Sequence, residues 1–208
     1  QLNAQTVPDK YPLPLIDEMF DAVQGARFFT TLDMMEAYYT IPIHPDSIEK
    51  TAMVTAQGQF VWRVMPFGLR NAPATYQRAL DSILRDCRTY ARPYLDDVII
   101  FSTDAESHLR HIRDVVQRLA SSKIKAKLAK CSFFRSECTY LGMMISGTTI
   151  RPDDAKISVI RNWPVPSNAA DVRQFHGLVN YLAKFCKDFA ELAAPLTDIM
   201  NSGWKSAD

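Results

Sequence analysis

The sequence predicts an α+β fold, and three observations support this prediction. Residues 51–68, "TAMVTAQGQFVWRVMPFG", alternate on either side of Gln57-Gly58, as the strands of a hairpin do. Residues 91–102 form two strand-like halves that flank an Asp pair. Helix-like segments are interposed between such hairpins, without the strict strand–helix alternation of a parallel α/β sheet, and this mixture favours α+β.

The N-terminal part predicts a helix followed by a strand. Residues 12–26, "PLPLIDEMFDAVQGA", have prolines at the entry and Gly25 as the stop. The apolar residues between them lie at helical spacing: Leu15, Ile16, Met19, Phe20 and Val23. Residues 27–33, "RFFTTLD", are typical of a strand that ends at Asp33.

The remaining elements follow the same patterns. Residues 72–88 and 104–121 predict helices, and residues 123–128 ("KIKAKL") and 139–150 ("TYLGMMISGTTI") predict strands. From Pro152 onward the pattern indicates only helices, broken by "NWPVPSN", so we expect a domain boundary near residue 148.

Composition sets the broad class of protein. The chain has 208 residues, of which 47% are hydrophobic and 23% charged, as in an ordinary globular protein with one sizeable core or two modest ones. The net charge of +1 means that any affinity for nucleic acid must come from a local patch. No apolar run approaches the roughly 18–20 residues of a membrane span, and the first residues lack a signal-peptide pattern. We therefore expect an intracellular protein without membrane contact.

Cysteine and histidine spacing gives little support to a zinc site. The four cysteines have no C-x-x-C spacing, which is typical of reduced thiols. His108 and His111 lie three residues apart on a predicted helix. They could form a two-ligand face, but we favour a solvated helix face because no third ligand is evident.

The segment "YLDDVIIF", residues 94–101, places two carboxylates inside a run with the composition of a buried strand. Burial of two adjacent charges is costly unless cations compensate them. A hairpin with Asp96 and Asp97 at its tip would solve this problem, with Asp33 converging from the end of another apolar strand. Magnesium prefers oxygen ligands, and two metals sharing carboxylates can promote phosphoryl transfer.

Two other interpretations of the Asp pair remain open on these residues alone. An apolar run that ends in Asp-Asp also suits a Walker B strand, although the sequence has no G-x-x-x-x-G-K-[ST] loop to accompany it. The pair could also be an acidic surface turn without a function.

Several segments taken together resemble one protein family. They are "LNAQTVPDKYPLPLIDEMFDAVQGARFFTTLD", "KTAMVTAQGQFVWRVMPFGLRNAPATYQRAL", "YLDDVIIFS", "KCSFFRSECTYLGMMIS", "RQFHGLVNYLAKF" and "APLTDIM". Their order and spacing resemble the reverse transcriptase of gypsy-type LTR retrotransposons and their retroviral relatives. The Y-x-D-D box and "MPFGLRNAPATYQ" are its most specific pair of motifs.

The resemblance implies a right-hand polymerase, with a palm of antiparallel sheet and flanking helices, partial fingers and a helical thumb. We expect residues 1–40 to be the palm entry segment with the first catalytic Asp, 41–72 partial fingers, 73–147 palm and 148–208 a thumb-like helical region. The family's upstream fingers strands, RNase H and integrase have no counterpart in the sequence. We therefore expect a fragment of a longer Pol polyprotein or a natural remnant.

The resemblance also implies roles for residues around the metals. Asp33, Asp96 and Asp97 would be the catalytic carboxylates and, with the backbone carbonyl of Met34, would bind two Mg²⁺ ions, for which Mn²⁺ could substitute. Tyr38, preceded by Ala37, matches the aromatic gate that excludes a 2′-hydroxyl, although a packed core aromatic is the alternative.

Further residues are expected to bind the substrates. Phe67 would pack on an incoming nucleotide, and Gln77 would approach template or nucleotide unless it is simply a surface residue. The expected primer and template contacts are Tyr94, Leu95, Leu141, Gly142, Met143, Arg173, Gln174 and Gly177. Lys123, Lys125 and Lys127 would share one face of a strand, which suits either phosphate contacts or a solvated face.

The implied function is template-directed DNA synthesis, in which a primer 3′-hydroxyl attacks the α-phosphate of a dNTP with the help of two metals. The expected partners are a primed RNA or DNA template, dNTPs and the rest of a Pol polyprotein. The location would be cytoplasmic, in a virus-like particle, or nuclear. An impaired or domesticated fragment that acts as a nucleic-acid-binding or scaffolding module is the alternative, and another two-metal nucleotidyltransferase or nuclease is a third.

Overall fold

The structure is a computed structural model that describes residues 2–202. The chain divides into two compact units, residues 2–140 with 146–148, and residues 141–145 with 149–202. The assignment of residue ranges to palm, fingers and thumb stays a prediction, and residues 1 and 203–208 of those ranges lie outside the described residues.

A four-stranded antiparallel sheet forms the centre of the first unit. Its strands are β1 (Phe28–Asp33), β4 (Ala91–Tyr94), β5 (Asp97–Ser102) and β6 (Ser132–Arg135), in the order β4-β5-β1-β6. The predicted strand that ends at Asp33 and the two predicted strand halves on either side of the Asp pair are confirmed. Strands β1 and β5 pair along their whole length.

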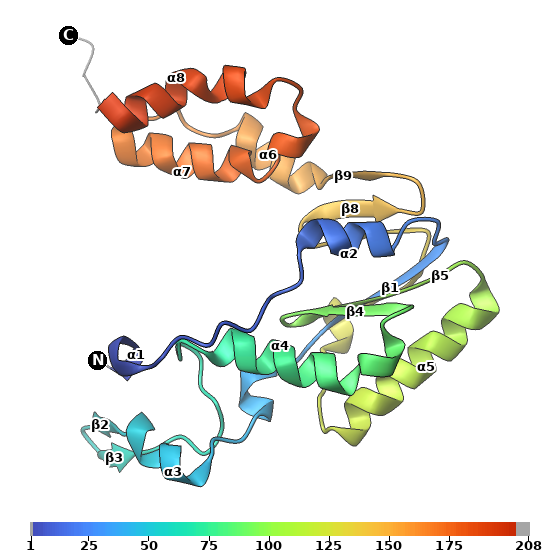
Figure 1. Cartoon of the computed structure of the whole chain (residues 1–208), viewed down its shortest axis with the longest axis vertical. Helices are drawn as coiled ribbons and strands as arrows, with labels where there is room; N and C mark the ends of the chain where they lie inside the picture. Colours follow the sequence, from blue (N-terminus) through green and yellow to red (C-terminus); the bar gives the residue numbers. More distant parts are fainter. Residues whose placement is uncertain (1, 203–208) are drawn as a thin grey trace. The chain divides into compact units, whose positions relative to one another are not determined.

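Helices cover both sides of this sheet, as Figure 1 shows. On one side lie α4 (Ala72–Ile83) and α5 (Ala105–Ser121), and on the other lies α2 (Ile16–Ala22). Alternate strand residues point toward α4 and α5, where they join one hydrophobic cluster. Its members include Leu32, Val98, Ile100, Tyr76, Leu80, Leu84, Val115 and Leu119. The sheet therefore has a rigid, packed support under the ends of β1 and β5.

Short elements connect β1 with α4. They are η1 (Ala37–Thr40), α3 (Pro45–Ile48), η2 (Glu49–Thr51), β2 (Met53–Thr55) and β3 (Gly58–Phe60), and the chain begins with α1 (Leu2–Gln5). The predicted hairpin is confirmed, because β2 pairs with β3 from Met53↔Phe60 to Thr55↔Gly58. Both strands are only three residues long and exposed.

The segment after α5 differs from the prediction. Residues 123–128 do not form a strand, because Lys123 adopts a φ of 59° and the amide of Ile124 bonds back to Leu119 at the end of α5. In this segment Ala126 forms an isolated β-bridge with Met34, just past the end of β1, before η4 (Leu128–Lys130) begins. The lysines of this segment therefore do not alternate along a strand. The strand in this region is β6, which the pattern missed, followed by β7 (Glu137–Tyr140).

The two histidines of α5 form neither a metal face nor a solvated face. His108 is fully buried, and its ring nitrogens lie 2.8 Å from the hydroxyls of Thr30 and Ser102. The Ser102 hydroxyl also lies 2.8 Å from Nδ1 of His111. Burial lowers the pKa of both histidines, so this hydrogen-bond chain favours neutral imidazoles.

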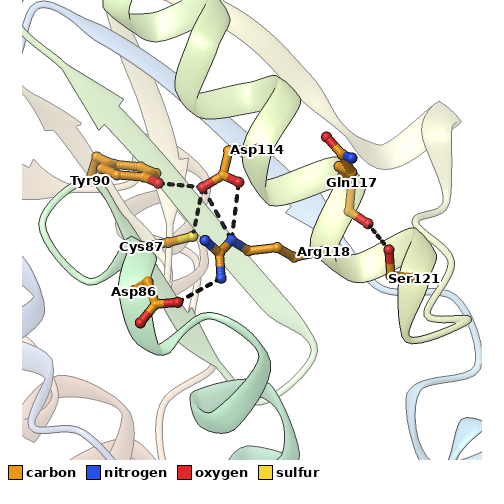
Figure 2. Close-up of polar contacts among 7 residues, drawn as sticks. All are labelled: Asp86, Cys87, Tyr90, Asp114, Gln117, Arg118 and Ser121. Carbon is orange, nitrogen blue, oxygen red and sulfur yellow. Dashed lines mark hydrogen bonds and ion pairs between the residues drawn. The ribbon is translucent and has the colours of Figure 1, made fainter.

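A polar cluster joins α5 to η3 (Arg85–Cys87) on the helical side of the unit (Figure 2). Asp114 accepts hydrogen bonds from the Tyr90 hydroxyl at 2.5 Å and from the Cys87 thiol at 3.3 Å. Arg118 bridges Asp114 and Asp86, at 3.1 and 2.9 Å. The cluster holds the loop before β4 against α5, and its charges are paired among themselves.

The second unit is a small hairpin followed by helices. Strands β8 (Met143–Ser146) and β9 (Ile150–Pro152) pair from Met143↔Pro152 to Ile145↔Ile150. The helical elements are α6 (Asp154–Arg161), α7 (Ala169–Asn180), η5 (Ala183–Phe185) and α8 (Phe189–Ser202). Across residues 2–202, no helix has the length and apolar character needed to span a membrane.

Candidate active site

A two-residue turn presents the Asp pair. Tyr94 pairs with Asp97, and Leu95 and Asp96 connect β4 to β5 between them. Leu95 adopts a φ of 52°, as the first central residue of a type II′ hairpin turn does. A left-handed conformation costs an L-residue about 1–2 kcal/mol. The turn is therefore strained and needs support from its surroundings.

Gln77 of α4 supplies that support. Its Oε1 accepts a hydrogen bond from the Leu95 amide at 2.7 Å, and its Nε2 donates to the Pro93 carbonyl at 3.1 Å. Nε2 also lies 3.2 Å from Oδ1 of Asp81. The side chain is fully buried. The alternative that Gln77 is simply a surface residue is therefore wrong: its polar atoms bind the turn that carries the Asp pair, and its approach to template or nucleotide stays a prediction.

Asp33 lies directly across the sheet from the Asp pair. In the pairing of β1 with β5, the Cα partner of Asp33 is Asp97. The Met34 amide donates to the Asp96 carbonyl at 2.8 Å, which extends this register past the end of β1. The strand ends thus bring together three carboxylates, and the backbone of Met34 with them, from positions more than 60 residues apart in the sequence.

The three carboxylates interact electrostatically. Burial, followed by the negative charges of Asp96 and Asp33, raises the pKa of Asp97 to about 6, and Lys130 opposes this shift. Asp96 also contributes to the raised pKa of Tyr38, after the larger effect of burial. Asp97 therefore sits in a region of excess negative charge, which Lys130 compensates only in part.

One cation contacts this cluster. Nζ of Lys130 lies 3.3 Å from Oδ2 of Asp33. The sequence analysis gave no role to Lys130. The Asp33 side chain is 24% exposed and the Lys130 side chain 58% exposed, so this pair is open to solvent.

The donor set suits a divalent cation with a preference for oxygen. Carboxylate oxygens on adjacent strands and a nearby backbone carbonyl are ligands that Mg²⁺ and Mn²⁺ accept. The mutual repulsion that raises the pKa of Asp97 would be relieved by a positive charge among the three. Within residues 2–202, no three acidic, histidine or cysteine side chains are arranged as ligands of one metal ion. Binding of a metal here would therefore require rotation of the carboxylate side chains.

Aromatic rings lie beside the carboxylates. The Tyr38 ring packs against Phe67, with centroids 4.9 Å apart, and edge-on against Tyr76 at 5.7 Å. Tyr38 is half-buried and Phe67 is 60% exposed, whereas Ala37 is buried. The structure thus brings two of the predicted nucleotide-binding side chains together and leaves Phe67 accessible.

The buried hydroxyl of Tyr76 is unusual. It is the one buried side-chain polar atom in the described part of the chain for which the structure gives no hydrogen-bond partner. Burial and the charge of Asp96 raise the pKa of Tyr76. No sequence pattern singled out this residue.

The predicted primer-contacting turn belongs to the second unit. Leu141 and Gly142 adopt φ angles of 50° and 68°, and Met143 begins β8. A Cβ on Gly142 would meet Nζ of Lys156 at 2.1 Å, but this flexible side chain can move away, so it is the left-handed φ that favours glycine here. Nζ of Lys156 lies 4.1 Å from the centroid of the Tyr181 ring, whose hydroxyl donates to the Leu141 carbonyl. The sequence analysis missed this bracing.

Three further residues that were predicted to contact primer or template also belong to this unit. Arg173, Gln174 and Gly177 are exposed on α7, where their spacing allows Gly177 to lie on the same face as the other two. A Cβ on Gly177 would meet no atom within 4 Å. Their nucleic-acid contacts stay a prediction.

Known proteins resemble this chain in sequence. The family model for "Reverse transcriptase (RNA-dependent DNA polymerase)" matches residues 1–145. Two Drosophila melanogaster relatives are the Pol polyproteins of transposon 297, 38% identical over 99% of this chain and 20% of that protein, and of transposon gypsy, 39% identical over 96% and 19%. The Tf2-3 polyprotein of Schizosaccharomyces pombe is 34% identical over 98% of this chain and 16% of that protein.

Solved structures agree in fold. The foamy viral protease-reverse transcriptase in complex with an RNA/DNA hybrid has a TM-score of 0.89 at 22% identity, over 98% of this chain and 28% of that one. A second form, in complex with double-stranded DNA, has a TM-score of 0.91 at 22% identity, over 99% and 36%. The chain spans about a fifth of the length of the curated relatives. It belongs to the reverse transcriptase (RNA-dependent DNA polymerase) family.

Proposed function

We propose that this chain is the polymerase core of a retrotransposon reverse transcriptase, which adds deoxynucleotides to a primer 3′-hydroxyl on an RNA or DNA template. The observation that carries the proposal is the turn-held Asp pair, placed in register with Asp33. Membership of the family and the relatives' origin in transposon Pol polyproteins support it. The solved neighbours with an RNA/DNA hybrid and double-stranded DNA support a nucleic-acid partner.

The carboxylates would bind two Mg²⁺ ions. Asp33, Asp96 and Asp97, with the Met34 carbonyl, are the proposed ligands. When bound, the two metals would activate the primer hydroxyl and stabilise the negative charge of the departing pyrophosphate. The protein itself contributes position: β1, β5 and Gln77 fix where the carboxylates stand, and such positioning can remove several kcal/mol from a reaction barrier.

The aromatic residues would shape the nucleotide site. The packed rings of Tyr38 and Phe67 present an apolar surface beside the carboxylates. A deoxyribose could pack there, whereas a 2′-hydroxyl would have to be buried against carbon atoms without a hydrogen bond. We propose that this surface favours dNTPs. The turn at Leu141–Met143 and the exposed residues of α7 are proposed to contact the primer and template, and the site of action is proposed to be intracellular.

Primer extension tests the proposal. The chain is incubated with poly(rA)/oligo(dT), dTTP and Mg²⁺, and incorporation is compared between the wild type and Asp96→Asn. We expect a loss of roughly 100-fold or more in the variant, because removal of a metal ligand costs several kcal/mol of transition-state stabilisation. Asp46→Asn is the matched control, because the Asp46 side chain is 86% exposed.

The outcomes distinguish the proposed function from its rivals. Incorporation that Asp96→Asn leaves unchanged would refute the role of the Asp pair. Primer–template binding without incorporation, even with Mn²⁺, would instead indicate a nucleic-acid-binding module. Phosphodiester cleavage in the absence of dNTPs would indicate a nuclease.

A further inference from the structure

Lys130 makes an ion pair with the acidic cluster formed by Asp33, Asp96 and Asp97. No other basic side chain in the described part of the chain is seen to pair with these carboxylates. Its Nζ lies 3.3 Å from Oδ2 of Asp33, and its charge also acts on Asp97, where it opposes the rise in pKa. The two residues of the pair are 97 positions apart in the sequence. A contact of this kind depends on how the fold holds the segment around Lys130.

Backbone hydrogen bonds hold that segment against the end of β1. The Lys127 amide donates to the Asp33 carbonyl at 2.8 Å, and the Met35 amide donates to the Lys125 carbonyl at 2.7 Å. Ala126 bridges Met34 between these two bonds. The short helix η4 then closes with a bond from the Lys130 amide to the Lys127 carbonyl at 2.8 Å. The base of the Lys130 side chain is therefore fixed beside Asp33.

The tip of the side chain is free to move. Lys130 is 58% exposed, and a lysine side chain has a flexible four-carbon stem that ends in a strongly hydrated point charge. An ammonium at 3.3 Å from Oδ2 lies in the space that a metal bound to the same oxygen would fill with its water shell, since Mg²⁺ binds oxygen at roughly 2.0–2.1 Å and retains several waters. The ammonium and the metal also repel each other.

We propose that Lys130 is an internal competitor for the metal site: it neutralises Asp33 when no divalent ion is bound, and it must swing away from Oδ2 before Asp33 can bind one. The inference rests on the proposed function, because it takes Asp33 as a metal ligand. Lys130 thereby lowers the affinity of the cluster for metal. Its charge also reduces the mutual repulsion of the three carboxylates. Lys130 therefore acts on the metal site through Asp33 and does not itself contact the substrates.

Metal binding measured without substrates tests the competition. Mn²⁺ binding to the chain is followed by electron paramagnetic resonance of the free ion, and Mg²⁺ binding is followed by competition against Mn²⁺. We expect Lys130→Met to bind Mn²⁺ roughly two- to fivefold more tightly than the wild type, which corresponds to the loss of one solvent-exposed ion pair. Lys130→Arg, which keeps the charge, should bind as the wild type does.

Lys127→Met is the matched control. Lys127 carries the same charge on the same segment, and the structure gives its exposed side chain no ion pair with an acidic residue of the described chain. A general loss of positive charge would tighten metal binding equally in both variants, and this result would overturn the proposal. Unchanged or weaker Mn²⁺ binding by Lys130→Met, or no binding by either protein, would also overturn it.

A double-mutant cycle separates this inference from the proposed function. In buffer with EDTA, the melting temperatures of the wild type, Lys130→Met, Asp33→Asn and the double variant are compared. We expect Lys130→Met to lower the melting temperature, and to do so less when Asp33 has already been replaced. Effects that simply add would refute the ion pair, whatever primer extension shows. The two proposals can also fail separately. If the cycle shows coupling between Lys130 and Asp33, and Lys130→Met binds metal more tightly, the competition for the metal site is supported. If neither the wild type nor any variant then incorporates dNTPs, the proposed function alone is refuted.

Discussion

Asp97 is held in the sheet at a cost in stability, and this cost can be measured. Burial and the charges of Asp96 and Asp33 raise its pKa from 3.8 to about 6. The folded protein therefore binds a proton more readily here than the unfolded chain does, so this residue lowers the free energy of unfolding as the pH rises from about 4 to about 6. A shift of roughly two units corresponds to up to about 3 kcal/mol at pH 7.5.

Asp97→Asn removes the charge and keeps the size of the side chain. In buffer with EDTA, we expect the variant to exceed the wild type in free energy of unfolding by up to about 3 kcal/mol at pH 7.5, falling to about 1.5 kcal/mol at pH 5 and about 0.5 kcal/mol at pH 4. Urea unfolding followed by circular dichroism measures the difference at each pH. The effects of titrating groups distant from Asp97 are common to both proteins and cancel.

A surface control variant and the addition of Mg²⁺ test this prediction further. Asp46→Asn, at a side chain that is 86% exposed, should stay within about 0.5 kcal/mol of the wild type at every pH. Saturating Mg²⁺ should stabilise the wild type more than Asp97→Asn and so reduce the gap. If Asp97→Asn is no more stable than the wild type at pH 7.5 in EDTA, burial and the neighbouring carboxylates do not raise the pKa of Asp97 as described.

Four further predictions concern single residues. Gln77→Leu should lower the free energy of unfolding by about 1–3 kcal/mol, because it removes the hydrogen-bond acceptor of the Leu95 amide. A free energy of unfolding in urea within about 0.5 kcal/mol of the wild-type value would contradict this. Leu95→Gly should be at least as stable as the wild type and clearly more stable than Leu95→Ile, because the left-handed φ suits glycine and disfavours β-branched residues. The reverse order of melting temperatures would exclude the strained turn. Tyr76→Phe should leave the melting temperature unchanged or raise it, since it removes a buried hydroxyl without a partner; a marked fall would reveal a hidden hydrogen bond. Burial lowers the pKa of His108, so the free energy of unfolding should fall as the pH drops below about 6.5, and ring resonances in NMR should titrate below that pH; an apparent pKa at or above 6.5 would contradict the neutral network.

Local pattern was enough to predict three of the four strands of the central sheet, β1, β4 and β5, and the carboxylates at their ends. The run before Asp33 and the halves around the Asp pair have the alternation and β-branched content of strands, and a two-residue turn places the acids at a tip. The position of Asp33 at the end of an apolar strand made it the candidate for the third carboxylate, and the family resemblance implied the same role. These features depend on neighbours that are close in sequence.

Features that depend on distant partners were missed. The partner of Gln77 is the Leu95 amide, 18 residues away, and a polar residue on an amphipathic helix is more often exposed than buried. His108 bonds to Thr30 across 78 residues, and Lys130 reaches Asp33 across 97. The lysine-rich segment was predicted as a strand because its alternation matched, but the left-handed Lys123 ends α5 and turns the chain.

The two-residue turn between β4 and β5 also limits how this protein can change in length. Every residue inserted at Leu95 or Asp96 would move Asp97 along β5 by about 3.3 Å relative to Asp33, and a shift by one position would turn its side chain to the other face of the sheet. The hairpin of β2 and β3 is exposed and carries no such register with the acids. Insertions and deletions should therefore be tolerated near Ala56-Gln57 and excluded at the turn that carries the Asp pair, so the length of this turn is constrained as well as its residue types.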